Sequence, residues 1–164
     1  MSKINDTEVE ENIIYFICYS NAENISMFRK LFDSRVIYTS CDCKDKIIID
    51  DKEYLNIVNI GDRYSIYIRL RTKLSKEEIK YISLYIAIII SDYIFVYKTK
   101  NINEAISELD IALELGKDIY AIPGDILSYE NYLANFCIKQ GAIPICSKYD
   151  IKYILDKKKK DNVL

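Results

Sequence analysis

The residue types that most often perform acid–base or nucleophilic chemistry are sparse in this chain. Its 164 residues include no histidine, which removes the commonest general base and the commonest neutral metal ligand. Serine–histidine and cysteine–histidine catalytic pairs are therefore excluded. Glu108, Asp110 and Glu114 fall within a segment with the pattern of an amphipathic helix, and we interpret them as its polar face. We expect a binding protein rather than an enzyme, without a cofactor.

The cysteines do not predict a metal site. Cys41 and Cys43 are separated by a single residue, and no second pair follows at the spacing of a zinc site. An odd number of cysteines without a secretory signal favours reduced thiols in the cytoplasm. The longest apolar run, 82–90, is far shorter than the roughly 20 residues that cross a bilayer, so we expect no membrane association. The five cysteines are Cys18, Cys41, Cys43, Cys137 and Cys146.

A basic, tyrosine-containing stretch is the first candidate binding site. Cations contact phosphates and tyrosine rings stack on bases, which suits a single-stranded nucleic acid. The net charge of −2 offers no global attraction to phosphate, so binding needs a local patch. Asp62, Glu77 and Glu78 dilute the charge, and an ordinary solvated face is the alternative. The predicted nucleic-acid-binding residues are Arg63, Tyr64, Tyr67, Arg69, Arg71 and Lys73, with Lys76 and Lys80 continuing the stretch.

Alternating apolar runs and helical patterns indicate the elements that must position these residues. Strands that alternate with helices predict an α/β fold of the Rossmann-like, doubly wound type, with a mainly parallel sheet and helices on both faces. Residues 46–50 and 54–60 suggest a hairpin, and 64–70 has the alternation of a half-buried strand. The predicted strands are 13–19, 35–39, 46–50, 54–60, 64–70, 93–97, 118–122 and 143–146; the predicted helices are 21–32, 75–90, 101–115, 128–140 and 147–155.

Helix ends are marked by specific residues. Ser75 and Glu78 form a capping box, and the helix after it is apolar almost all round, which predicts burial on more than one side. Gly116 and Gly141 follow two helices at the position where a left-handed conformation is needed. The predicted organisation is a leader at 1–11, one domain at 12–156 and a basic tail at 157–164.

A second candidate site lies where the predicted parallel strands end, because such sheets bind ligands at their carboxyl edge. Free N–H groups at a helix start attract phosphate, although Asn101 or Asn103 equally suits a helix N-cap. We expect a shallow crevice that accepts one phosphate or a sulfate but not a whole mononucleotide. Its predicted lining is Thr99, Asn101, Asn103, Pro123 and Gly124, with Ser20 and Asn21 as further neighbours.

An ordered series of short motifs lies in 91–154. It begins with Ser91-Asp92 before the apolar run 93–96 and continues with the Ala-Leu-Glu-x-Gly-Lys turn at 112–117. The strand and Pro-Gly pair at 118–124 follow. A helix bearing Asn135 and ending at Gly141-Ala142 comes next, and Ser147-Lys148-Tyr149-Asp150 opens the last helix.

Together, these motifs resemble those of the DprA/Smf DNA-processing family. The resemblance implies an extended Rossmann-like fold, binding of single-stranded DNA, loading of a RecA-type recombinase during natural transformation, and self-association as a homodimer. It also adds Asn135 to the ligand crevice. The anion-binding, glycine-rich turn of the family corresponds to 98–103 here, which contains no glycine. Two alternatives stay open: a small nucleotide- or nucleoside-binding protein, including a hydrolase, and a degenerate scaffold that binds protein.

Overall fold

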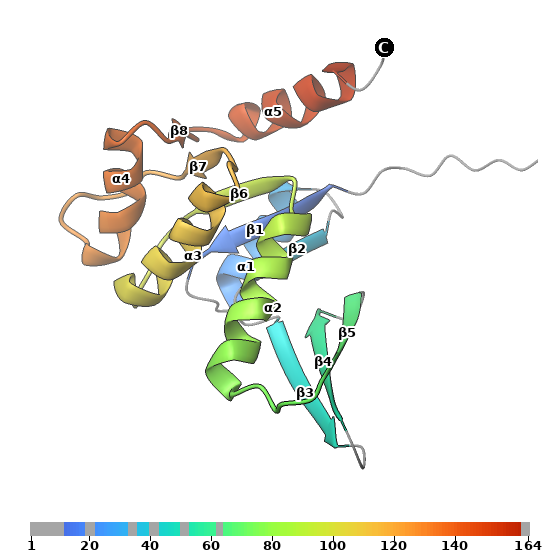
Figure 1. Ribbon diagram of the computed structural model, residues 1–164. Helices are drawn as coiled ribbons and strands as arrows, with labels where there is room; N and C mark the ends of the chain where they lie inside the picture. The colour runs from blue at the N-terminus through green and yellow to red at the C-terminus, as the bar shows by residue number, and fades with distance from the viewer. Residues whose placement is uncertain are drawn as a thin grey trace, which may run out of the picture.

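The computed structural model describes residues 12–18, 22–32, 36–39, 43–49, 53–61 and 64–161. Its elements alternate between strands and helices, except that four consecutive strands precede the second helix (Figure 1). In chain order they are β1 (Ile13–Ile17), α1 (Ala22–Leu31), β2 (Val36–Thr39), β3 (Cys43–Ile49), β4 (Tyr54–Ile60), β5 (Tyr64–Leu70), α2 (Lys76–Ile90), β6 (Tyr93–Val96), α3 (Ile102–Glu114), β7 (Ile119–Ala121), the 3₁₀ turn η2 (Tyr129–Asn131), α4 (Tyr132–Lys139), β8 (Ile143–Pro144) and α5 (Lys148–Asp161).

Five strands form one parallel sheet in the order β2-β1-β6-β7-β8. β1 lies between β2 and β6. Ile14 of β1 pairs with Tyr93 of β6, although three strands of a second sheet and α2 lie between them in the sequence. All five residues of β1 are buried, as expected for a strand with packed layers on both faces. The prediction of an α/β protein with a parallel sheet is therefore confirmed.

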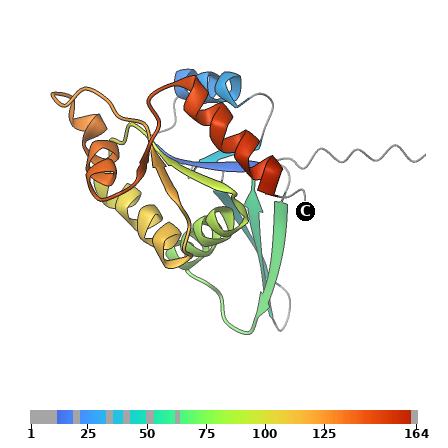
Figure 2. The ribbon, with the colours of Figure 1, turned by 90° about the horizontal axis from the view of Figure 1, so that it is seen from above.

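Helices cover both faces of this sheet, and the two faces have separate cores (Figure 2). Tyr15 and its neighbours on one face pack with α2, α3 and α4. Phe16 and the other face pack with α1 and α5. The second core is strongly aromatic: the Phe16 ring stacks on Phe28 with centroids 3.7 Å apart, and Phe95 lies 5.3 Å away.

The strands β3, β4 and β5 form a second, antiparallel sheet of their own. The prediction located these three strands, but β3 begins three residues earlier than expected, and the sequence did not indicate that they leave the parallel sheet. α2 packs against this small sheet and against the parallel sheet (Figure 1). This double packing explains the apolar composition of α2, although Tyr81 and Ile89 remain exposed.

The predicted helix ends are largely correct. Ser75 Oγ accepts a hydrogen bond from the Glu78 amide at 3.1 Å, and Glu78 Oε1 accepts one from the Ser75 amide at 3.3 Å. Gly116 and Gly141 have φ values of +68° and +109°, where a side chain would be strained. α5 differs: it continues to Asp161 rather than ending at Leu155, because lysine is a good helix former even without an apolar repeat.

Candidate nucleic-acid interface

The predicted crevice begins after β6, where the backbone of Thr99 is bonded to the segment that contains Glu130. The Thr99 amide donates to the Glu130 carbonyl at 2.9 Å, and the Thr99 side chain is 2% exposed. Asn101 is the N-cap of α3, and its Oδ1 accepts from the Glu104 amide at 3.3 Å. Asn103 is exposed on the first turn. The capping interpretation of Asn101 is therefore the observed one.

The Pro123-Gly124 turn is held by two asparagines. Asn135 accepts from the Gly124 amide and donates to the Gly124 carbonyl, both at 3.1 Å. Asn131 is buried and donates to the Asp125 carbonyl at 3.2 Å. A Cβ on Gly124 would lie 2.2 Å from Asn131 Oδ1, so the asparagine occupies the space that a side chain or a ligand would need.

The structure therefore brings Gly124 and Asn135 into direct contact. Thr99 is buried, and its backbone is bonded to Glu130. Asn101, Asn103 and Pro123 are exposed. Ser20 and Asn21 lie outside the described residues.

A cavity of about 550 Å³ lies at the opposite, amino-terminal edge of the sheet, beside α5. Tyr93 and Tyr120 line it with ring centroids 6.0 Å apart, and Asp118 also belongs to its lining. Burial raises the pKa of the Tyr120 phenol, and the Asp118 carboxylate raises it further. The sequence did not indicate this cavity, because its lining residues come from segments that lie far apart in the chain.

Unfolding at alkaline pH provides a test of the Tyr120 environment. In the unfolded chain the Tyr120 phenol has a pKa of about 10, and the folded protein keeps this phenol protonated above that pH. The contribution of the protonated phenol to the free energy of unfolding is therefore complete below the unfolded pKa. It is lost as the pH rises through the higher pKa of the folded state. We expect Tyr120→Phe to make the free energy of unfolding, measured in urea from about pH 8 to about pH 11, fall less steeply. The exposed Tyr81→Phe is the control, and equal slopes for both variants would contradict the prediction.

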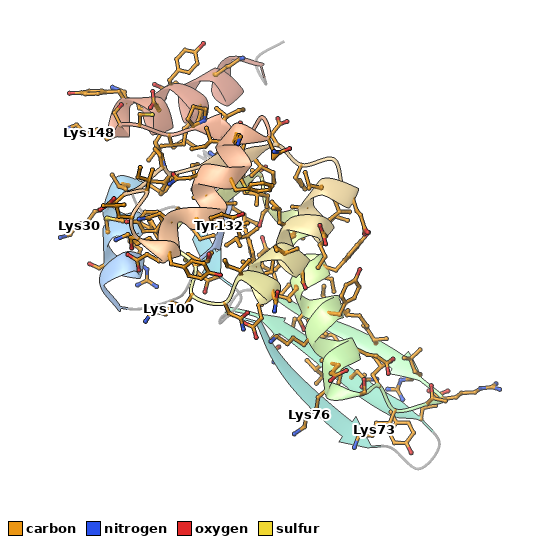
Figure 3. The ribbon with its side chains drawn as sticks, turned by 90° about the vertical axis from the view of Figure 1, so that its left-hand side faces the viewer. Lys30, Lys73, Lys76, Lys100, Tyr132 and Lys148 are labelled. Carbon is orange, nitrogen blue, oxygen red and sulfur yellow. The ribbon has the colours of Figure 1, made fainter. Side chains whose placement is uncertain are left out.

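The predicted basic stretch is divided by the structure. Residues of β5 alternate between the two faces of the small sheet, so Tyr67 and Arg69 lie on the outer face while Tyr64 belongs to the other. Tyr67 is 67% exposed. Arg71 and Lys73 are exposed in the link to α2, near Lys76 (Figure 3). Arg63 lies outside the described residues.

The outer face of the small sheet carries apolar residues beside the tyrosine and the arginine. In the antiparallel register Tyr67 pairs with Ile57, and Arg69 pairs with Leu55. Arg69 Nε lies 3.7 Å from Glu53 Oε2, and both side chains are largely exposed. α2 packs on the opposite face, and Figures 1 and 2 show no helix of the described chain over the outer one.

Exposed aromatic residues on η2 and α4 form a second surface that the sequence did not single out. Tyr129, Tyr132 and Phe136 are nearly parallel, with successive ring centroids 6.2 and 6.0 Å apart. Tyr132 lies on the side of the molecule that Figure 3 presents. The preceding turn exposes Ile126 and Leu127 by 88% and 90%. The i, i+3, i+7 spacing is visible in the sequence, but it also suits a buried helix face.

The acidic residues of α3 are not all solvated, which corrects their interpretation as a polar face. Glu108 is 4% exposed and its Oε1 accepts a hydrogen bond of 2.6 Å from the Tyr15 hydroxyl. Asp110 and Glu114 are exposed as expected. Tyr15 and Glu108 therefore form a buried polar contact between β1 and α3.

Among the described residues no three histidine, cysteine, aspartate or glutamate side chains gather as a metal site would require, and Cys41 lies outside them. In the same described part, none of the helices has the length and apolar character needed to cross a membrane. No family model matches the sequence, and no curated protein matches it either.

Proposed function

We propose that this chain is a non-catalytic, DprA/Smf-like protein that binds single-stranded DNA in the cytoplasm, with a RecA-type recombinase as its expected partner. The supporting resemblance covers 91–154. With the inserted sheet left out, the strand order becomes 2-1-3-4-5, the order of one class of doubly wound, Rossmann-like sheets. We therefore also propose that the parallel part of the fold belongs to this class.

One observation carries the binding proposal: Tyr67 and Arg69 lie two residues apart on the outer face of the small sheet, which no helix of the described chain covers (Figures 1 and 2). An aromatic ring with a neighbouring cation on an open surface can stack a base and contact its phosphate. Ile57 and Leu55 are the cross-strand neighbours of these two residues and enlarge the apolar surface of this face. Burial of Thr99 and Asn131 at the predicted strand-end crevice disfavours the nucleotide-binding alternative there.

Binding of a fluorescent oligothymidylate, measured by anisotropy at several salt concentrations, tests this proposal. Each phosphate contact contributes a slope of about −0.7 to the logarithmic salt dependence for single strands, so Arg69→Ala should flatten the slope by about that amount. Tyr67→Ala should cost about 1–3 kcal/mol, the value of one stacked base, with the slope retained. Glu53→Gln should strengthen binding because it removes a carboxylate that lies beside Arg69 and would repel a phosphate.

Matched controls separate this face from the rest of the surface. Tyr81→Ala removes an exposed tyrosine from α2, and Lys139→Ala removes an exposed cation from the end of α4; neither should change the affinity. Absence of binding at low salt, or equal affinity in the Tyr67 and Tyr81 variants, would reject the proposed face.

The row of Tyr129, Tyr132 and Phe136 favours a second candidate function, binding of a protein partner. Contiguous exposed apolar side chains mark interaction surfaces. Glu130 is the charged residue within this row, and its Oε1 lies 3.3 Å from Lys98 Nζ, so the row offers no free cation for phosphate. Retention of DNA binding in Tyr132→Ala would separate this surface from the DNA face.

A further inference from the structure

A groove between α1 and α5 is lined by cations and is separate from every surface described above. It has a volume of about 380 Å³, within the range of small-molecule sites. Lys30 enters it from the last turn of α1, and Lys148 and Lys152 from the first two turns of α5. Figure 3 shows Lys30 and Lys148 on the same side of the molecule.

The charge in this groove is poorly compensated by the protein. Asp156 is the acidic residue among its described lining, yet no described carboxylate lies within 4.0 Å of the three lysine amines. Lys148 and Lys152 are four residues apart on one helix, where like charges repel each other. Three cations from two elements therefore surround a volume that an anion would stabilise.

An aromatic ring stands beside these cations. Tyr149 is 70% exposed, and the Lys148 amine lies 5.4 Å from its ring centroid. A planar base could stack on such a ring while its phosphates meet the lysines. The apolar side of α5, with Ile151 and Leu155, is buried in the core.

From these contacts we infer that the α1–α5 groove binds a nucleoside di- or triphosphate. The phosphate chain lies among Lys30, Lys148 and Lys152, and the base lies against Tyr149. Lysine suits this role because its flexible stem carries a compact charge that can follow a mobile phosphate. The inference is independent of DNA binding on the small sheet, since the two sites share no residue.

Calorimetry with ADP, pyrophosphate and adenosine in a metal-free, low-salt buffer tests the inference on the full chain. ADP should bind most tightly, pyrophosphate more weakly, and adenosine least. Lys148→Ala and Lys152→Ala should each weaken ADP binding about tenfold, the worth of one charge-assisted hydrogen bond. Tyr149→Ala should reduce the affinity for ADP to that for pyrophosphate. Lys139→Ala is the control and should leave every affinity unchanged.

Two further measurements distinguish nucleotide binding from a structural role of the lysines and from binding of nucleic acid. Lys152→Ala should keep or raise the thermal midpoint of the free protein, because it removes a like-charge neighbour; a lower midpoint together with weaker binding would indicate a structural role and reject the assignment. Binding of an oligothymidylate but not of ADP, lost in the two lysine variants, would assign the groove to nucleic acid instead. ADP binding that persists in a Tyr67→Ala/Arg69→Ala variant separates the groove from the DNA face.

Discussion

Tyr15→Phe is expected to lower the free energy of unfolding by about 2 kcal/mol, the cost of leaving a buried acceptor without its donor. The lost bond is the 2.6 Å contact from the Tyr15 hydroxyl to Glu108 Oε1, and the two side chains are 0% and 4% exposed. Phenylalanine keeps the ring in the core, so the change isolates the hydroxyl. Urea unfolding at neutral pH measures the effect.

A double-mutant cycle with Glu108→Gln makes this test specific. Glutamine keeps the shape of the side chain, so the double variant should be less destabilised than the sum of the two single changes if the two groups interact directly. Tyr81→Phe removes a hydroxyl from an exposed ring and should change the stability by less than about 0.5 kcal/mol. An equally small effect at Tyr15 would show that the buried contact contributes nothing.

Gly124→Ala is expected to destabilise the protein by about 2–3 kcal/mol, in the upper range for overpacking. The new Cβ would lie 2.2 Å from Asn131 Oδ1 and 2.3 Å from its Cγ. Asn131 cannot easily move away, because it is buried and its amide donates to the Asp125 carbonyl. Thermal or urea unfolding measures the loss.

Removal of the obstructing side chain should rescue this variant. Asn131→Ala alone loses the hydrogen bond to Asp125, but Gly124→Ala/Asn131→Ala should be more stable than the sum of the single effects predicts. Gly116→Ala is the contrasting case: a Cβ on Gly116 would meet nothing within 4 Å, and only the φ of +68° penalises a side chain there. Additive effects at Gly124 and Asn131 would contradict the steric explanation.

Local signals in the sequence predicted much of the fold because their causes are local. The capping box at Ser75, the left-handed Gly116 and the alternation along β5 depend on neighbours within a few residues. The separation of β3, β4 and β5 into their own sheet depends on which distant strand pairs with β1, and no short pattern specifies that choice. α5 is longer than predicted because apolar periodicity ends at Leu155 while helix propensity continues.

The candidate sites were less predictable for a related reason. The alternation along β5 placed Tyr67 and Arg69 together, but it also separated Tyr64 from them. The α1–α5 groove joins Lys30 to Lys148 across more than a hundred residues, so neither lysine was distinguishable from an ordinary surface cation. Glu108 was assigned to a polar face because its partner, Tyr15, is 93 residues away.

The position of the small sheet has a consequence for the order of folding. β1 is buried between β2 and β6, and its pairing with β6 joins residues 79 apart, Ile14 with Tyr93. β3, β4 and β5 pair only with their sequence neighbours, so their hairpins close over short loops. Such local contacts form faster than distant ones. During synthesis from the N-terminus, the apolar strand β1 therefore lacks β6 as its pairing partner until the entire inserted sheet and α2 have been made.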